Sequence, residues 1–449
     1  MSEITDAKIR ATKNLRFFIV FRMFFNARFY YPVFAIYFLE HGLTWEQFGI
    51  LNGIWAITII LLEVPSGAFA DTLGRKRLLV LAGVFMVLEM LALLVAPMDG
   101  SVWVFSLFAV NRIISGVAEA AASGADEALA YDSLKEAGME KEWGKVLEKA
   151  QRYTSLAFFF AMMTGSAFYD ASFVNTCLDF FGFDFSVSDG TTVKIPVFLT
   201  LLSSLIVLGA ALGLQENIRE SGHGTFEAIR SSLRKTKVAG IWILTTALPF
   251  GILLAAMILD SIIRQFLTIA SAYWSVIELP LWTFGLVASG MSLMGLFVPR
   301  LARLLADRNS PAFNFFLLCA VLTAGLFGIG YAFPLWGILP AALLYASMQG
   351  MHYLTSRYLN EEASSEQRAT VLSFKGLSTN LSYGAVSLLY SGLIAWIKSG
   401  KIEPIVMGRK LAEQDSVFVQ ALGWFPWYFL VTFALIVLTY RLRFGKKTA

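Results

Sequence analysis

One stretch of the 449-residue chain places ionisable side chains at regular intervals inside an apolar run. Steps of four, three, four and three residues separate Arg112, Gly116, Glu119, Ser123 and Asp126. Because these steps follow the turn of an α-helix, the sequence predicts one polar stripe on a single helical face. Burial in apolar surroundings raises the pKa of a carboxyl group, and a neighbouring arginine lowers it. The pKa therefore changes when a conformational change alters the burial or the distance to the arginine, so the stripe is suited to reversible protonation.

A second acidic residue, Glu89, lies in the middle of another apolar run. An ionised side chain at the centre of a membrane costs about 2.5–3.5 kcal/mol, so each one needs a partner, a water-filled cavity or a function. The ionisable residues that need an explanation are therefore Glu119, Glu89, Arg112 and Asp126, and the two glutamates are candidates for reversible protonation. For Glu89 the alternative is a structural carboxylate satisfied by a neighbouring helix, and for Asp126 it is gating or packing against the basic loop at 75–77.

A further group of polar side chains in apolar runs is expected to line a solute cavity: Arg28, Asn26, Tyr30, Gln349, His352, Asn380 and Tyr383. On a continuous helix, Arg22, Asn26 and Tyr30 share one face, and Arg28 points about 120° away. The two arginines are therefore predicted to serve different sites. For His352, a purely structural role is the alternative to proton transfer.

The composition indicates a membrane protein, because 57% of the residues are hydrophobic and only 15% are charged. Soluble domains carry about 25% charged residues. Runs of about 20 apolar residues are long enough to cross a bilayer. They predict twelve spans, at 16–39, 46–68, 78–97, 102–123, 150–170, 195–214, 238–262, 280–299, 311–332, 335–358, 369–397 and 421–442. Little of the chain is left for a soluble catalytic domain.

The distribution of basic residues predicts the topology. Most of the 36 lysines and arginines fall in connections on the side of the N-terminus, including the motif at 75–77. Basic loops face the cytoplasm, so both termini of this multi-pass protein are expected there, in the cytoplasmic (inner) membrane. The connection at 215–237 divides the chain into two halves, 1–214 and 238–449. Its spacing of Phe226, Ile229 and Leu233 predicts a helix at the membrane surface, the alternative being a solvated linker helix.

The loop after the second span carries a recognisable motif. It places glycines, an acid and basic residues in the order Gly67, Asp71, Gly74, Arg75 and Arg77. The loop resembles the signature G-x-x-x-D-x-x-G-R-[KR]-[KR] of the major facilitator superfamily, between helices two and three. Its glycines permit a tight connection, and its aspartate can cap a neighbouring helix and pair with the arginine, so the motif is expected to switch between conformations.

Two further features support the resemblance. Residues 295–303 form a degenerate second copy of the loop, as expected of an internal repeat. Arg112 and Gly116 match the R-x-x-x-G core of a helix-four motif, which is linked to proton transfer in proton-coupled members. Thr72 departs from the family, which often has arginine there. The fifth span contains Gly165 but lacks the Gly-Pro pair typical of many drug exporters.

The resemblance implies an all-α integral membrane fold, with twelve transmembrane helices in two pseudo-symmetric six-helix halves. The expected function is secondary active transport of a small organic solute by alternating access, as proton-coupled efflux (antiport) of an amphiphilic drug or metabolite. One alternative is proton-coupled uptake (symport) of an organic anion, indicated by Arg28 and Arg112. Another is a non-transporting receptor on the same scaffold.

The chain lacks the motifs of an enzyme or an ATP-driven pump. There is no Walker loop, no HExxH or GxSxG motif, and only two cysteines, Cys177 and Cys319. Neither catalysis, a metal nor a cofactor is expected, and the proton gradient is the expected energy source. The expected partners are the lipid bilayer and a small-molecule substrate, with no nucleic acid, and the chain is expected to be a monomer.

Overall fold

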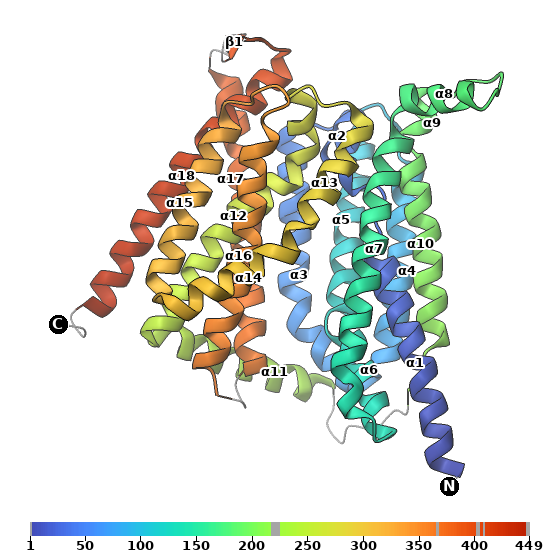
Figure 1. The fold of residues 1–449 in the computed structure, drawn as a ribbon, viewed down its shortest axis with the longest axis vertical. Helices are drawn as coiled ribbons and strands as arrows, with labels where there is room; N and C mark the ends of the chain where they lie inside the picture. The colour runs from blue at the N-terminus through green and yellow to red at the C-terminus, as the bar shows by residue number, and fades with distance from the viewer. Residues whose placement is uncertain (1, 217–224, 365–367, 401–404, 407–408, 446–449) are drawn as a thin grey trace. The chain divides into compact units, whose positions relative to one another are not determined.

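A computed structural model describes residues 2–216, 225–364, 368–400, 405–406 and 409–445. In these residues the chain is almost entirely helical (Figure 1). Strand is confined to β1 (Ile405–Val406), which pairs antiparallel with β2 (Arg409–Lys410). The chain divides into two compact units: unit 1 comprises Met1–Leu43, Thr58–Leu233 and Leu281–Ser289, and unit 2 comprises Thr44–Ile57, Arg234–Pro280 and Gly290–Ala449.

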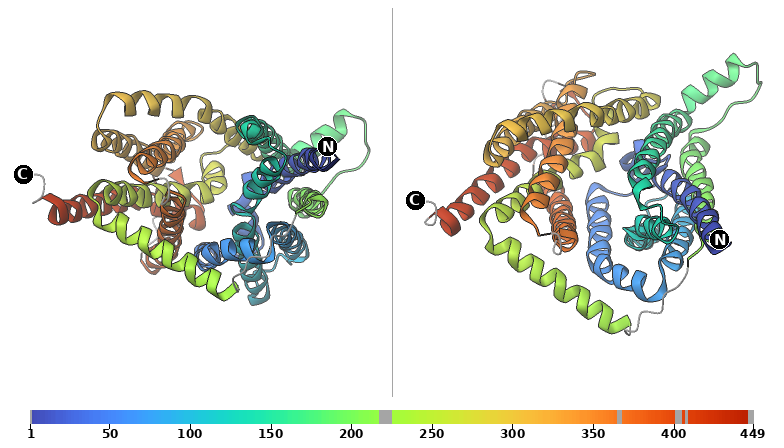
Figure 2. Two further views of the ribbon diagram at one scale, coloured as in Figure 1. Left: turned by 90° about the horizontal axis from the view of Figure 1, so that it is seen from below. Right: turned by 60° about the horizontal axis from the view of Figure 1, so that its bottom comes forward.

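Unit 1 is built on the helices of the first part of the chain. They are α1 (Ser2–Asn26), η1 (Tyr31–Val33), α2 (Phe34–Glu40), α3 (Trp45–Leu73, shared with unit 2), α4 (Arg75–Val95), α5 (Val102–Ala122), α6 (Ala125–Glu136), η2 (Glu140–Glu142), α7 (Trp143–Tyr169), α8 (Ala171–Phe180), α9 (Asp189–Thr192) and α10 (Ile195–Gly213). Within this unit α4 packs against α5 and α10, and α1 packs against α7 and α10 (Figure 2). Small and aliphatic residues such as Ala82, Met86 and Val207 fill the core.

Unit 2 is centred on α12. Its helices are α11 (Thr225–Thr245, shared with unit 1), α12 (Ala247–Val276), α14 (Met294–Arg308), α15 (Pro311–Gly330), α16 (Ile338–Glu362), α17 (Arg368–Ser399) and α18 (Glu413–Phe444). The short helix η3 (Leu281–Thr283) and most of α13 (Phe284–Ser292) belong to unit 1. α12 packs against α16, α17 and α18, and α15 packs against α16 and α18.

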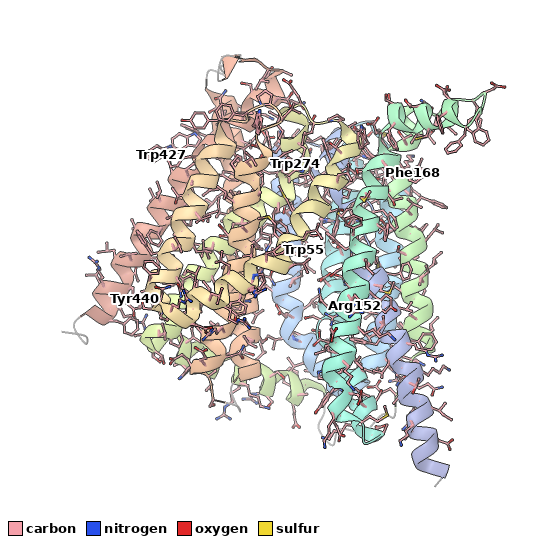
Figure 3. The ribbon with its side chains drawn as sticks, in the orientation of Figure 1. Trp55, Arg152, Phe168, Trp274, Trp427 and Tyr440 are labelled. Carbon is pink, nitrogen blue, oxygen red and sulfur yellow. The ribbon has the colours of Figure 1, made fainter. Side chains whose placement is uncertain are left out.

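The described residues contain nine helices long and apolar enough to cross a membrane, or ten if the bent pair α7 and α8 counts as one span. Large aromatic side chains, such as Phe168 and Trp427 in Figure 3, are exposed on these helices, as expected where lipid replaces water. The predicted all-α membrane fold is confirmed. The predicted run 335–358 falls outside the nine because α16 carries polar side chains such as Gln349 and His352.

The first predicted span is not one helix. α1 ends at Asn26, residues 27–30 are not helical, and Pro32 lies in the short helix η1. Proline removes a backbone donor and restricts the residue before it, so Pro32 favours an interruption of the helix here. The Phe29 amide instead donates to Thr200 Oγ1 at 3.0 Å. The expectation that Asn26 and Tyr30 share a helical face is therefore wrong.

Two other predicted elements have different bounds. The seventh span, predicted at 238–262, straddles a break at Thr246: α11 extends to Thr245, and α12 runs from Ala247 to Val276 with Pro249 in its first turn. The apolar run hides this break from the sequence. In the fourth span, Gly124 adopts a positive φ of 74° between α5 and α6, so the stripe that ends at Asp126 is not on one helix.

The break at 27–30 packs closely against α7. A Cβ on Gly165 would collide with the Phe29 carbonyl, lying 2.7 Å from its carbon, whereas a Cβ on Gly209 of α10 would meet no described atom within 4 Å. Gly165→Ala is expected to lower the Tm, because overpacking costs about 1–3 kcal/mol and outweighs a helix-propensity gain of about 0.5–1 kcal/mol. Gly209→Ala is the control and should hold or raise the Tm. Thermal unfolding in detergent measures both; equal Tm values would contradict the close packing.

Candidate functional site

Glu89 of α4 is the centre of a buried ion network in unit 1. Its side chain has no exposed surface, and both carboxylate oxygens accept from Arg28 Nη1 at 2.9 Å. Tyr30 OH donates to Oε1 at 3.3 Å, and Arg112 Nη2 lies 3.6 Å from the same oxygen. The break after α1 places both Arg28 and Tyr30 next to this carboxylate. The prediction that Arg28 points away from the face of Tyr30 assumed a continuous helix, and the break makes it wrong.

Asn111 holds the second arginine in place. Its Oδ1 accepts from Arg112 Nε at 3.0 Å and Nη2 at 2.8 Å, and its Nδ2 donates to the Glu89 backbone carbonyl at 2.8 Å. Asn111 was not among the residues predicted from sequence; its only signal is an amide beside Arg112 in an apolar run. We call Arg28, Tyr30, Glu89, Asn111 and Arg112 the Glu89 network.

The arginines of the Glu89 network are packed against aromatic rings. The Arg112 guanidinium lies 5.2 Å from the Phe34 ring centroid and 5.4 Å from that of Phe38. The Arg28 guanidinium lies 5.4 Å from the Phe25 centroid and 5.7 Å from that of Tyr31. Such contacts stabilise a cation where water is excluded.

Positive groups outnumber negative ones inside the Glu89 network. Two guanidinium groups face the single carboxylate of Glu89, and the buried Arg28 Nη2 makes no hydrogen bond to any described residue. A further acid, Glu119 of α5, interacts electrostatically with Arg28 and Glu89. The Glu119 side chain is exposed. An accessible carboxyl group thus lies within electrostatic range of an inaccessible ion pair.

Asp126 belongs to a second ionic group at the start of α6. Arg22 Nε lies 3.5 Å from its Oδ2, and Arg22 also pairs with Glu127. Asp126 interacts electrostatically with Glu119, so the two groups are linked. Asn26 donates to the Arg22 carbonyl at 2.8 Å and is exposed.

The glycine-containing loop lies between α3 and α4. Gly74 has a φ of 96°, a conformation that favours glycine, whereas Gly67 lies inside α3 with no described atom within 4 Å of an added Cβ. Arg75 Nη1 donates to Asp132 Oδ2 at 2.5 Å, and the Arg77 side chain is exposed. The side chain of Asp71 lies outside the described residues, so its role stays a prediction.

Glu216 caps the helix that this loop opens. Its two carboxylate oxygens accept from the backbone amides of Arg75, at 2.9 Å, and Lys76, at 2.8 Å. A carboxylate at this position satisfies free amides and complements the positive end of the α4 dipole. Glu216 was not among the residues predicted from sequence, and its only signal is its place after the sixth apolar run.

Unit 2 has its own polar group around Arg264 of α12. Arg264 Nη1 donates to Asn380 Oδ1 at 2.7 Å, its guanidinium lies 5.0 Å from the Tyr383 ring centroid, and it pairs with Asp260. His352 of α16 is exposed and interacts electrostatically with Arg264. Of the predicted residues, Asn380, Tyr383 and His352 are thus brought together, while Gln349 hydrogen-bonds Tyr345. Arg264 lies just beyond the predicted run 238–262, but it is well inside α12 because the helix extends to Val276.

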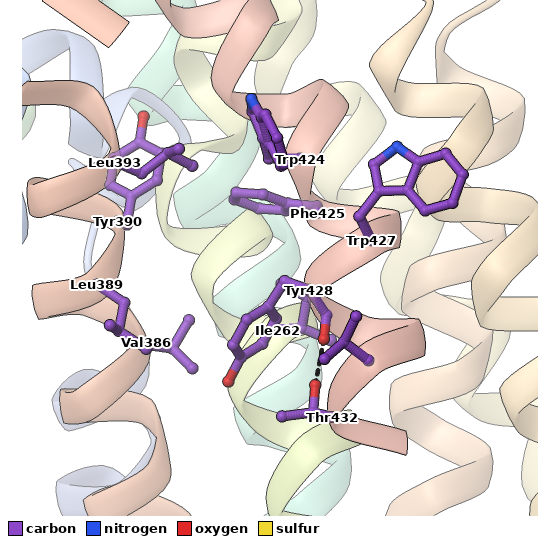
Figure 4. A pocket seen from close by; sticks show the side chains of 11 residues that line it. Ile262, Val386, Leu389, Tyr390, Leu393, Trp424, Phe425, Trp427, Tyr428 and Thr432 are labelled. Carbon is purple, nitrogen blue, oxygen red and sulfur yellow. Dashed lines mark hydrogen bonds between the residues drawn. The ribbon is translucent and has the colours of Figure 1, made fainter. Parts of the chain in front are cut away.

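A cavity of about 460 Å³ opens between α12, α17 and α18 (Figure 4). Its lining is almost wholly apolar and includes Trp424, Phe425 and Trp427. None of the residues predicted to bind a solute lines this cavity. Its lining, in the residues that the structure describes, has no charged side chain, so it cannot form an ion pair with a solute.

Comparison with known proteins identifies both sequence and fold relatives. A sequence profile of the Major Facilitator Superfamily matches residues 16–387. A structure of a variant of the nucleoside transporter NupG superposes with a TM-score of 0.66 at 12% identity, covering 94% of this chain and 99% of that one. A bacterial homolog of the human lysosomal transporter Spinster gives 0.64 at 14% identity, covering 97% and 96%. The D-xylose–proton symporter gives 0.63 at 14%, covering 94% and 97%. No curated protein sequence matches significantly.

Replacing Glu89 with glutamine tests the network. Glu89→Gln leaves two buried arginines facing a neutral amide, and breaking a buried ion pair costs about 3–5 kcal/mol, so the Tm should fall sharply. Glu148→Gln, in an exposed pair with Arg152, is the matched control and should leave the Tm nearly unchanged. Removing the opposing charge as well, in Arg28→Gln/Glu89→Gln, should recover part of the loss. A Tm for Glu89→Gln equal to that of Glu148→Gln would contradict the network.

Proposed function

The chain belongs to the Major Facilitator Superfamily, and we propose that this transporter exports an amphiphilic organic solute in exchange for protons. One observation carries the proposal. The exposed carboxyl group of Glu119 lies within electrostatic range of a buried network in which two arginines face one carboxylate. Proton binding at Glu119 therefore changes the charge balance around Arg28.

The proposed coupling is a competition for Glu119. When ionised, Glu119 offsets the excess positive charge of the Glu89 network and attracts the cationic end of an amphiphile. When protonated, it loses this attraction, and Arg28 is left to Glu89 alone. Because proton and solute cannot both occupy the carboxylate, binding of one favours release of the other, as exchange requires.

In unit 2 we propose that the cargo contacts Arg264, Asn380 and Tyr383. These side chains offer a hydrogen-bonding amide, an aromatic face and a partly exposed guanidinium. Ligand sites commonly combine aromatic surface with a few such polar groups. His352 and Gln349 of α16 are further cargo-binding candidates, and Asp126 and Arg112 further coupling candidates.

Uptake of an organic anion together with protons is the second candidate. The buried Arg28 Nη2, which makes no hydrogen bond to any described residue, supports it. An anionic group at this atom would complete the charge balance of the Glu89 network. A receptor without transport activity is less well supported, because it needs no protonatable group beside the network.

The remaining parts of the proposal follow from the sequence. We propose that the chain acts as a monomer in the cytoplasmic membrane with both termini in the cytoplasm. The halves 1–214 and 238–449 are proposed to alternate around the cargo, driven by the proton gradient without a metal, a cofactor or catalysis. The loop at 67–77 is proposed as the conformational switch.

Glu119→Gln tests the proposed coupling. In proteoliposomes, the variant should lose pH-gradient-driven accumulation of ethidium, a cationic amphiphile, because glutamine cannot bind or release a proton. Exchange of ethidium across the membrane without a pH gradient should remain, since the path itself is unchanged. The exposed Glu148→Gln is the control and should behave as wild type. Undiminished accumulation by Glu119→Gln would exclude this carboxyl group as the coupling site.

The sign of the proton movement separates the two candidates. In weakly buffered vesicles, adding ethidium outside should acidify the medium if protons leave as solute enters. Adding benzenesulfonate should instead make the medium more alkaline if an anion enters with protons, and Arg28→Gln should abolish that response. If benzenesulfonate made the medium alkaline and ethidium did not acidify it, the result would contradict export and support uptake.

A further inference from the structure

A short helix leaves the end of α7 almost at a right angle. α7 and α8 meet at Asp170 at an angle of 88°, and Figure 1 shows α8 projecting sideways on the side of unit 1 away from the N-terminus. The 27 residues of α7 extend about 40 Å, but charged residues reach as far as Arg152, and α7 has the length and hydropathy of a membrane span only together with α8. For an α7 that lies along the membrane normal, the 88° bend directs α8 along the membrane plane.

Asp170 fixes the direction of α8. Its Oδ1 accepts from the Phe173 amide at 3.2 Å, which caps the helix, and its Oδ2 accepts from the Trp282 amide at 3.3 Å. The rings of Phe173 and Trp282 stack at 5.5 Å. Two separate elements of unit 1 thus hold the start of α8.

The loop that follows is folded back onto the helix. Gly182, with a φ of 77°, ends α8, and the Phe183 amide donates to the Leu178 carbonyl at 3.0 Å. The amide group of Asn175 bonds both backbone groups of Val187, at 3.0 and 2.8 Å. We call α8 and residues 181–188 the aromatic hairpin.

Four phenylalanines at the tip of the aromatic hairpin are highly exposed. Phe180, Phe181, Phe183 and Phe185 expose 83%, 72%, 52% and 59% of their surface. The helix itself is amphipathic, with an apolar face of Phe173, Val174, Cys177, Leu178 and Phe181 and a polar face of Ser172, Asn175, Thr176 and Asp179. An apolar surface of this kind in an ordered segment marks an interaction site.

We propose that the aromatic hairpin is an interfacial anchor whose phenylalanines insert at the boundary between headgroups and acyl chains. Phe168, near the end of α7 that leads into the hairpin, is also exposed (Figure 3). Amphipathic helices that lie at this depth bury their apolar face in the same way. The inference concerns how unit 1 is held in the membrane and does not rest on the proposed transport function.

The charges of the aromatic hairpin and its flanking residues indicate which lipid headgroups it can bind. Residues 170–190 contain four aspartates and no lysine or arginine. Anionic headgroups would be repelled rather than attracted, so the binding surface fits neutral or zwitterionic lipids. Insertion is then driven by apolar contact and is insensitive to salt, which screens charge interactions only.

Spin labels on single cysteines test the anchor in phosphatidylcholine vesicles. The native Cys177, on the apolar face, is labelled in a Cys319→Ser variant, which leaves the hairpin unchanged. Phe181→Cys and Thr176→Cys, in protein lacking both native cysteines, report on the tip and the polar face. Labels at 177 and 181 should collide more with oxygen, which concentrates in lipid, and the label at 176 more with a water-soluble nickel chelate. Phe168→Cys provides the lipid-facing reference.

Two further outcomes decide the assignment. The difference in oxygen and nickel-chelate accessibility between the labels at 177 and 181 and the label at 176 should persist at high salt. It should not increase when phosphatidylglycerol is added. Equal access of the nickel chelate to labels at 176, 177 and 181 in monodisperse protein would overturn the proposal. Dipolar broadening between labels at 181 would also overturn it, because it would assign the surface to a second copy of the chain.

Discussion

The burial of one carboxylate constrains much of unit 1. Glu89 has no exposed surface within an apolar helix, and a charge in that position is tolerated only with close partners. Its partners come from two places: the break after α1 supplies Arg28 and Tyr30, and α5 supplies Arg112, held by Asn111. The relative positions of α1, α4 and α5 are therefore fixed by electrostatics as well as by packing.

Interruptions in the helices position several of the functional side chains. Residues 27–30 turn Arg28 toward Glu89, Gly124 separates Asp126 from the stripe on α5, and Asp170 redirects the chain into α8. At each interruption regular backbone pairing stops, and side chains or glycines take its place. The Glu216 carboxylate likewise accepts hydrogen bonds from the first backbone amides of α4.

The two units hold Arg112 and Arg264 in a similar way. Arg112 lies against Phe34 and Phe38, and Arg264 lies against Tyr383, each with an amide side chain as acceptor and an acid close by. Aromatic faces and amide oxygens hold a cation without a full opposing charge at every nitrogen.

Sequence alone determined the membrane location, the all-α fold, and the residues with functional promise, including Glu89, Arg28 and Arg112. These follow from local properties: composition, helical period, and the glycine that a positive φ requires at Gly74. Tertiary structure decided which charges meet. Arg28 and Glu89 are 61 residues apart, and their contact depends on a helix break that the apolar pattern of 16–39 conceals. Hydrophobic periodicity reports which residues avoid water, but pairing depends on backbone direction, which only the folded chain defines.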